Sequence, residues 1–431
     1  MDDIEYIKLH IDDYAEEEGW VDSYGVEYSM DRKVLLSMRE IDSSLTSYEI
    51  RKGTLAVASW IFYDSDFCGD IYIPKTVQYI DGGAFTHSGI QNVICSSDWY
   101  YIEEGLIIDS QSHFIVSAFN TNCVLELPKD IQGIYHNAFT NNYSLKELII
   151  NNENFTIEED AFSDCEGLRS FQIKSKYLTI GEHAFDVVIS LKRVDIASEN
   201  LSIGKHAFRY CHKLEHVRIS GDLQLLNIFK DCHSLQYLDL PSSIIEISDY
   251  CFSECKKLKS FILPENVQTI GKAAFENCES LTNIHFNNHL ERINRRAFKN
   301  CTSIKYLILP DTLEAIEEFA FENCHNIRYL ILRGPTNNIG SSAFWGCYGI
   351  HYILLISPTY ELINNRSFEY IDTKKIIINQ NNLPAQLGWM QHDVKGYIVF
   401  MDFSIEDILN DIGAFFNNLD INIGFSIYDS Y

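Results

Sequence analysis

Cysteine is the residue type with the clearest capacity for chemistry in this chain, and eight of the twelve cysteines recur in one regular phase. These eight are Cys165, Cys211, Cys232, Cys255, Cys278, Cys301, Cys324 and Cys347. Thiolates at a fixed spacing could bind a soft metal or pair as disulfides. No CxxC pair accompanies them, and one small, polarisable residue repeated in a single phase is typical of a filled core position. We therefore predict a structural role for these thiols, with no metal site and no cofactor.

Histidines form the second group with ligand chemistry. His212 and His216 stand four residues apart, a spacing that would bind zinc if both lay on one helix. The repeat described below places His216 on a strand, so we interpret both as surface residues. The sequence contains no nucleophile elbow, Walker loop, zinc-protease helix or clearly partnered pair of carboxylates. We predict that the protein is not an enzyme and has no catalytic residue.

The elements that position these residues follow from a period of 23 residues. The marker of the period is a Phe that returns at Phe62, Phe85, Phe139, Phe162, Phe185, Phe208, Phe229, Phe252, Phe275, Phe298, Phe321, Phe344 and Phe368. In most units Ile stands five residues before this Phe, and apolar residues stand nine and eleven residues after it. Those two positions alternate with polar ones, as in a strand with one buried face. One strand per short coil predicts a solenoid whose coils stack as a parallel sheet.

Two other parts of the repeat predict how each coil turns. The segment around Ala and Phe suggests one short helical turn, with Ala allowing close packing and Phe filling the core. Gly often follows the Ile that stands five residues before the Phe, as Gly181, Gly204 and Gly271 do. We expect a positive φ there, because glycine turns corners that other residues avoid.

The repeat resembles a known family. IGKAAFENCESLTNIHF (270–286) and IEEFAFENCHNIRYLIL (316–332) are similar to the BspA-like leucine-rich repeats of bacterial and protozoan proteins, many of them surface antigens. The resemblance covers residues 57–378. It implies a right-handed leucine-rich-repeat solenoid, β-rich α/β in class, with a parallel β-sheet on one face and short helical turns. It also implies a part in adhesion or in recognition of host or neighbouring-cell proteins.

The chain divides into three predicted regions. Residues 1–56 form an acidic N-terminal cap with a hairpin, and residues 57–378 form a solenoid of about 13 coils with a hairpin insertion near 100–120. Residues 379–431 form a C-terminal cap. Within it, SIEDILNDIGAFFNNL (404–419) places its apolar residues at helical spacing and predicts an amphipathic helix over the last coils.

Charge restricts the possible partners and the N-terminus bears on the compartment. The chain holds 34 Lys and Arg against 61 Asp and Glu, a net charge of -27. Such a charge opposes binding that depends on neutralising phosphates, so we predict no nucleic-acid partner. No window approaches the eighteen or so apolar residues of a membrane span, so we predict no membrane insertion. The first residues, MDDIEYIKLH, lack the basic and apolar regions of a secretory signal and favour a cytoplasmic protein. The family resemblance favours the cell surface or secretion instead.

Outward-facing strand residues form two candidate binding surfaces. The aromatic stripe spans three late coils and consists of Tyr306, Ile308, Tyr329, Ile331, Tyr352 and Leu354. Adjacent apolar residues facing outward would form a patch of the size that marks an interaction site. The polar face spans three earlier coils and consists of Arg193, Asp195, His216, Arg218, Tyr237 and Asp239. Cross-strand pairing alone explains its alternating charges.

We therefore predict a non-enzymatic scaffold that presents an extended β-sheet surface to a protein partner. Three alternatives stay open. The aromatic stripe could mediate self-assembly into a homo-oligomer, the C-terminal segment could cover that stripe, and the polar face could be the active site of a carbohydrate-active solenoid.

Overall fold

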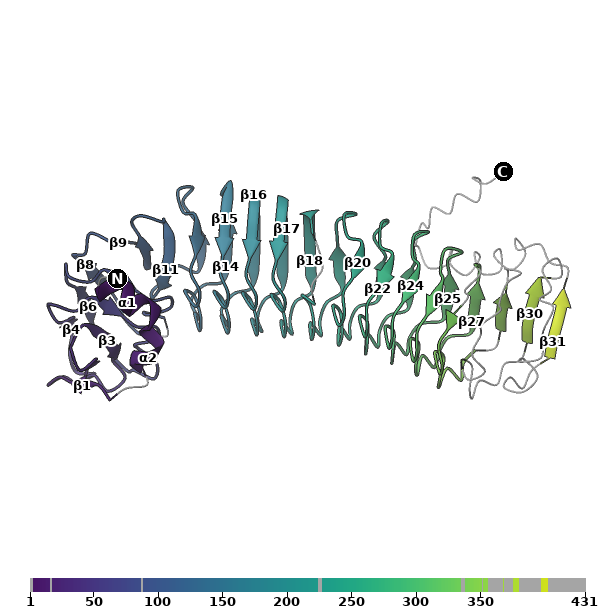
Figure 1. Ribbon diagram of the computed structural model, residues 1–431, viewed down its shortest axis with the longest axis horizontal. Helices are drawn as coiled ribbons and strands as arrows, with labels where there is room; N and C mark the ends of the chain where they lie inside the picture. The colour runs from purple at the N-terminus through teal and green to yellow at the C-terminus, as the bar shows by residue number, and fades with distance from the viewer. Residues whose placement is uncertain are drawn as a thin grey trace.

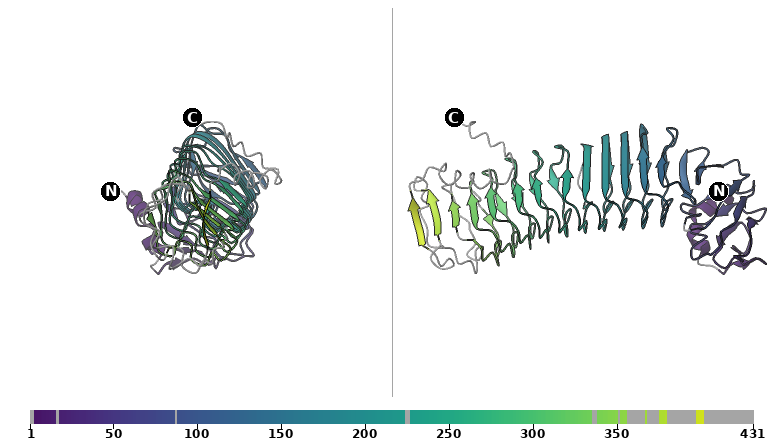
Figure 2. Two further views of the ribbon diagram at one scale, coloured as in Figure 1. Left: turned by 90° about the vertical axis from the view of Figure 1, so that its right-hand side faces the viewer. Right: turned by 180° about the vertical axis from the view of Figure 1, so that it is seen from behind.

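A computed structural model describes residues 3–15, 18–86, 88–223, 227–334, 338–350, 352–355, 367, 375–379 and 397–401. These residues wind into a long β-solenoid whose coils stack along one axis (Figure 1). Viewed along that axis, the coils superimpose around a shared interior (Figure 2). The prediction of a solenoid of about 13 coils with parallel sheets is confirmed.

The N-terminal region feeds directly into the stack. It contains α1 (Asp3–Leu9), α2 (Ile11–Ala15), β1 (Trp20–Val21), β2 (Glu27–Tyr28) and β3 (Val34–Ser37). The strands β1, β2 and β3 pair antiparallel, and β3 then pairs parallel with β5 (Ala56–Val57) of the following coil. The last strand of this antiparallel group therefore provides the edge with which the first coil pairs.

Most coils contribute short strands to two sides of the solenoid, which we call face A and face B. Face A holds one ladder of strands, and in the coils with a marker Phe the face A strand follows that Phe by about eight residues. They are β4 (Ser47–Glu49), β6 (Asp70–Ile73), β8 (Val93–Cys95), β12 (Val124–Glu126), β14 (Glu147–Ile150), β16 (Ser170–Ile180), β17 (Arg193–Ile203), β18 (His216–Asp222), β19 (Tyr237–Asp239), β21 (Ser260–Ile262), β23 (Asn283–His285), β25 (Tyr306–Leu309), β27 (Tyr329–Leu332), β29 (Tyr352–Leu355), β30 (Lys375–Asn379) and β31 (Tyr397–Met401).

Face B holds the strands that end five residues before the Phe, at Ile or, in β5, at Val57, and this second ladder was not predicted from the sequence. They are β5, β7 (Tyr79–Ile80), β13 (Gly133–Ile134), β15 (Asn154–Ile157), β20 (Glu246–Ile247), β22 (Thr269–Ile270), β24 (Arg292–Ile293), β26 (Ala315–Ile316) and β28 (Asn338–Ile339). The long strands β16 and β17 run through both faces, because no turn interrupts them.

A hairpin insertion divides the interior into two cores. It consists of β9 (Tyr100–Glu103), β10 (Leu106–Asp109) and β11 (Phe114–Ala118), paired antiparallel, and β11 rejoins the parallel ladder through β13. Ile107 and Val116 pack into the N-terminal core, whereas Leu106 and Ile115 pack into the long core that continues to Ile353. Alternation along the hairpin thus lets one pair of strands cover both cores.

Columns of identical residues fill the long core. The ring of Phe275 stacks on Phe252 at 5.3 Å and on Phe298 at 5.1 Å between centroids, and the column continues along the array. All eight in-phase thiols are buried, and each donates to a backbone carbonyl of the preceding coil, as Cys278 does to Phe252 at 3.2 Å. Burial raises the pKa of Cys165 to about 12. A thiol fits here because it fills the volume and supplies a weak donor.

The turns around the marker Phe differ from the prediction. No helix occurs there in the described coils; the segment forms turns in which residues two before and two after the Phe have positive φ, as Asp160 and Asp164 do. The expected positive φ at Gly181 is wrong, since that glycine is not among the positive-φ residues. A Cβ on Gly181 would instead lie 2.5 Å from the amide nitrogen of Glu159 in the preceding coil. Close approach of two backbones, and not turning, excludes a side chain there.

The face A ladder continues through β29, β30 and β31 to Met401. The predicted amphipathic helix over 404–419 lies outside the described residues. Among the residues that are described, no helix combines the length and apolar character that a membrane span requires.

Candidate functional site

Face A is interrupted in the middle of the array. β18 pairs with β19 and β21 pairs with β23, but β19 does not pair with β21, nor β23 with β25. The same coils remain paired on face B, where β20, β22, β24, β26 and β28 form one continuous sheet. The stack therefore opens on one side only. We call the gap between β19 and β21 the seam.

Backbone hydrogen bonds show what the seam lacks. In the coil before it, the amides of Gln236 and Tyr237 both donate to the carbonyl of Glu215, at 3.1 and 3.0 Å. The matching bonds would join the amides of Lys259 and Ser260 to the carbonyl of Gln236. Within the uninterrupted stretch 227–334, neither bond is present. Each wall of the seam is thus a strand edge inside the array.

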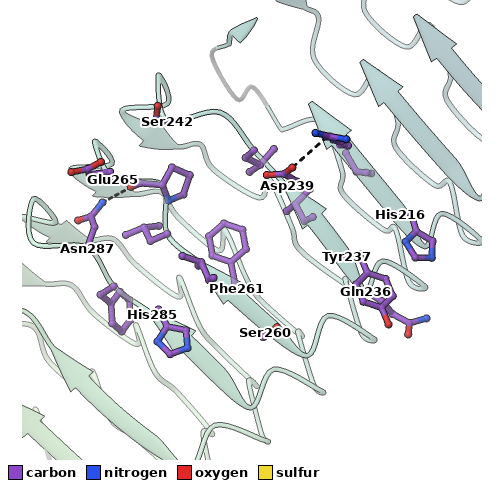
Figure 3. A pocket seen from close by; sticks show the side chains of 18 of the residues that line it. His216, Gln236, Tyr237, Asp239, Ser242, Ser260, Phe261, Glu265, His285 and Asn287 are labelled. Atoms are coloured by element: carbon purple, nitrogen blue, oxygen red, sulfur yellow. Dashed lines mark hydrogen bonds and ion pairs between the residues drawn. The ribbon is translucent and has the colours of Figure 1, made fainter. Parts of the chain in front are cut away.

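The opening exposes part of the hydrophobic core. Leu238, Leu240, Ile284 and Phe286 occupy the inward strand positions, yet all four are only partly buried. The same positions are buried in flanking coils, as in β17, β18, β25 and β27. Three of them, Leu238, Leu240 and Phe286, line a groove of about 950 Å³ together with polar residues on its rim (Figure 3). Its volume lies in the range of ligand-binding clefts.

All six residues of the polar face line this groove. The imidazole of His216 stacks on the ring of Tyr237 at 4.5 Å with an interplanar angle of 4°. Arg218 Nε lies 3.6 Å from Asp239 Oδ2, and the guanidinium of Arg193 binds Asp195. The hydrogen bond to Asp195 raises the pKa of Arg193. The sequence placed these side chains on neighbouring strands, and the structure makes them one wall of a cleft.

The opposite wall was not predicted from the sequence. Ile262 points outward from β21 and is 75 % exposed, and Phe286 and His285 lie beside it on the next coil. Partial burial lowers the pKa of His285, which keeps its imidazole neutral near pH 7. Asn287 Nδ2 donates to the carbonyl of Pro264 at 2.5 Å (Figure 3) and to the carbonyl of Val267 at 2.9 Å, and so anchors this wall. The sequence feature that could have indicated this wall is Ile262, an isoleucine at an outward-facing strand position.

The aromatic stripe is less accessible than the alternation of its residues suggests. The rings of Tyr306 and Tyr329 stack at 5.5 Å and are half-buried, as is Ile308. Ile331 is only 2 % exposed, so the expectation that it lies on an open surface is wrong. Tyr352 and Leu354 follow in register on β29. Alternation fixes the direction of a side chain and does not determine what lies above it.

One cluster in the described residues has the composition of a metal site. Asp231, His233 and Glu254 offer ligand atoms within 4.8 Å of one another. The carboxylate of Glu254 is already engaged, since Lys256 Nζ lies 3.1 Å from one oxygen and Asn277 donates to the other. An ammonium group in contact with a ligand opposes a bound cation. The cluster is better explained as an ion-pair network between coils.

These features define the class of protein: a parallel β-solenoid of leucine-rich-repeat type, with a cleft where one of its sheets is interrupted. The chain belongs to the BspA type leucine rich repeat family, whose repeat matches in six copies over residues 41–114, 132–227, 225–351 and 268–386. The predicted family is confirmed. A comparison with curated proteins finds no match.

Several solved structures are similar to the chain. A leucine-rich repeat protein from Eubacterium ventriosum is 20% identical over 54% of this chain, with a TM-score of 0.46, and the match spans 64% of that protein's length. A leucine rich cell surface protein from Faecalibacterium prausnitzii is 17% identical over 79% of this chain and 95% of its own, with a TM-score of 0.42. A leucine-rich repeat protein from Bacteroides ovatus is 18% identical over 89% and 97%, with a TM-score of 0.45.

Proposed function

We propose that the protein is a non-enzymatic scaffold that binds a protein partner through face A, centred on the groove beside the seam. The observation that carries the proposal is the coincidence of exposed apolar side chains and unpaired strand edges at one place. Tyr237 is 61 % and Ile262 75 % exposed, and Leu238 and Leu240, the core residues next to Tyr237, are only partly buried. Apolar exposure at a cleft is typical of an interaction site.

A carbohydrate-active role fits the groove less well. Hydrolysis of a glycosidic bond requires one carboxyl group that gives up a proton and a second that remains ionised. Asp195 pairs with Arg193, and Asp239 Oδ2 lies 3.6 Å from Arg218 Nε. Both carboxylates of the polar face are thus already engaged by an arginine. We propose binding without turnover, and the family resemblance extends this proposal to adhesion or host recognition.

The aromatic stripe is proposed as a second contact region, through Tyr306, Ile308 and Tyr329. Two stacked tyrosine rings bring a large contact area at little cost in conformational entropy. The stripe begins at β25, directly beyond the second break in face A, so one extended partner could contact both regions.

Two matched tyrosines allow a test of the groove. Tyr237 and Tyr348 are each 61 % exposed, and each stacks on a histidine of the preceding coil, at 4.5 and 5.7 Å. Tyr348 lies outside the groove. Partners are captured by photo-cross-linking in native lysate and medium, purified, and titrated against Tyr237→Ala and Tyr348→Ala.

We expect Tyr237→Ala to weaken binding at least about tenfold and Tyr348→Ala to leave it unchanged, because contact aromatic residues dominate binding energy. Equal affinities for both variants would refute the groove as the contact surface. Sedimentation of the purified chain is the control for self-assembly: a partner that proves to be a second copy would replace the scaffold proposal by the structural alternative.

A further inference from the structure

The seam offers main-chain groups as well as side chains. The amides of Lys259 and Ser260 lack the bond to the Gln236 carbonyl that other coils make. A buried strand edge costs free energy unless water or another chain satisfies it, and an exposed one is a template for a further strand. Extended peptides use such edges in many complexes, where main-chain hydrogen bonds give affinity and pockets for alternate side chains give specificity.

The floor of the groove supplies a pocket of that kind. Leu238 and Leu240 beside the seam and Phe286 on the coil of β23 line the groove and are only partly buried, and Ile262 lies on the rim. An apolar side chain entering this slot would cover surface that the flanking coils bury by themselves. Each methylene group transferred from water in this way contributes roughly 0.8 kcal/mol. A segment with an aliphatic or aromatic residue therefore fits better than a uniformly polar one.

The charges around the groove indicate which residue type should flank the apolar residue of the bound segment. Both arginines of the groove are already paired, Arg193 with Asp195 and Arg218 with Asp239. Glu265 lines the opposite wall, is exposed, and makes no ion pair with any described residue. The chain as a whole carries -27. A basic side chain near the apolar residue would complement Glu265 and the field of the whole protein.

We propose that the seam binds an extended segment of a protein partner. The segment lies along the gap between β19 and β21, hydrogen-bonds to the free amides at the start of β21, and inserts one apolar side chain into the slot. A lysine or arginine of the segment faces Glu265. This inference rests on the proposed function and adds the form of the ligand: an extended strand rather than the surface of a folded domain.

Other occupants would leave part of this chemistry unused. An acyl chain would fill the slot but could not pair with the amides of Lys259 and Ser260. A glycan would stack on Tyr237 but would meet an aliphatic floor. Both are outcomes of the experiment that would overturn the proposal.

The test selects displayed random peptides of about ten residues, the length of a long strand, on the full chain. The affinity of each enriched peptide is then measured on Ile262→Asp. The matched control is Ile245→Asp, since Ile245 is likewise highly exposed, at 60 %, but lies beside face B and outside the groove. We expect enrichment of peptides that combine one apolar residue with Lys or Arg, and an affinity at least about tenfold weaker for Ile262→Asp than for Ile245→Asp.

Main-chain pairing is tested separately from side-chain contact. N-methylation of the selected peptide at successive positions should abolish binding with a period of two, because only alternate amides of a strand face the ladder. Hydrogen exchange at Lys259 and Ser260 should slow when the peptide binds. The amides of Thr282 and Asn283, already bonded to the Lys259 carbonyl at 2.9 and 3.4 Å, should not change.

The outcomes separate this inference from the proposed function. If no peptide is enriched, or N-methylation shows no period of two, the extended-segment proposal fails even where Tyr237→Ala still weakens the captured partner. Ile262-dependent binding of neutral phosphatidylcholine vesicles or of an oligosaccharide panel would assign the slot to another ligand and also overturns the proposal. If Tyr237→Ala has no effect on any partner, the proposed function fails first.

Discussion

Replacing Phe275 by Ala tests whether stacked rings hold adjacent coils together. The side chain is fully buried, stacks on Phe252 and Phe298, and meets Phe261 edge-on at 4.9 Å between centroids. Removing a buried Phe ring costs about 3–5 kcal/mol through lost transfer energy and the cavity left behind. Three aromatic contacts at roughly 0.5–1.5 kcal/mol each place the expected loss at the upper end of that range.

Phe286→Ala is the matched control. Phe286 is the same residue type and directly follows β23, but it is partly exposed in the groove and its ring lies 6.0 Å from Phe298 in a perpendicular contact. Truncation there removes less buried area and leaves an open cleft instead of a cavity. We expect a loss of about 1–2 kcal/mol.

Urea unfolding followed by far-ultraviolet circular dichroism measures both variants against the unaltered chain. Repeat arrays can unfold in parts, so hydrogen exchange of the amides in β22 and β24 provides a local second measurement. A loss below about 1 kcal/mol for Phe275→Ala, or equal losses for the two variants, would show that the rings do not carry the interface between coils.

Two further predictions concern titratable groups. His136 Nε2 lies 3.2 Å from Asp81 and Nδ1 lies 3.5 Å from Glu158, and the hydrogen bond to Asp81 raises the pKa of His136 to about 10 from 6.5. Because the pKa is higher in the folded state, protonated His136 stabilises the fold fully below pH 6.5 and progressively less up to about pH 10. The urea midpoint should therefore fall between these two pH values, and the fall should be smaller in His136→Gln. An identical pH dependence in the variant would contradict the pairing. For the thiols, iodoacetamide should label Cys68 and Cys123 in the native chain and the nine buried cysteines only after denaturation. Mass spectrometry of the labelled chain measures this, and labelling of the buried cysteines before denaturation would mean that the core is open.

The repeat made much of the fold predictable. Each coil places Phe, Cys and the two strand residues in the same phase, so the direction of Phe275 or Leu307 follows from position alone, and both are buried. The second ladder on face B was not predicted, because a two-residue strand such as β22 is too short to show alternation. The turns were missed for a related reason. Positive φ falls on residues as different as Asp160, Val187 and Phe319, so composition does not mark them.

The candidate site was only half predictable. The six residues of the polar face share one side of neighbouring strands, and spacing alone identifies that neighbourhood. A period, however, describes every coil as equivalent, and the groove exists because the coils on either side of the seam are not. Leu238, Leu240, Ile284 and Phe286 have the residue types of ordinary core positions, so the sequence does not show that they are only partly buried.

The one-sided opening has an energetic consequence that favours a functional interpretation. Stability in a repeat array is approximately a sum of coil terms and nearest-neighbour interfaces, so each break in face A weakens one interface. Every backbone hydrogen bond absent from the seam forgoes about 0.5–1.5 kcal/mol, and the partly exposed core residues forgo further burial. The interface persists because face B, the Phe column and the thiol bonds still cross it, as in the 3.4 Å contact of Cys255 with the Phe229 carbonyl. A partner segment that pairs with the free strand edge would form the missing hydrogen bonds, and its apolar side chain would bury the partly exposed core residues. Binding should therefore stabilise the seam more than any other part of face A.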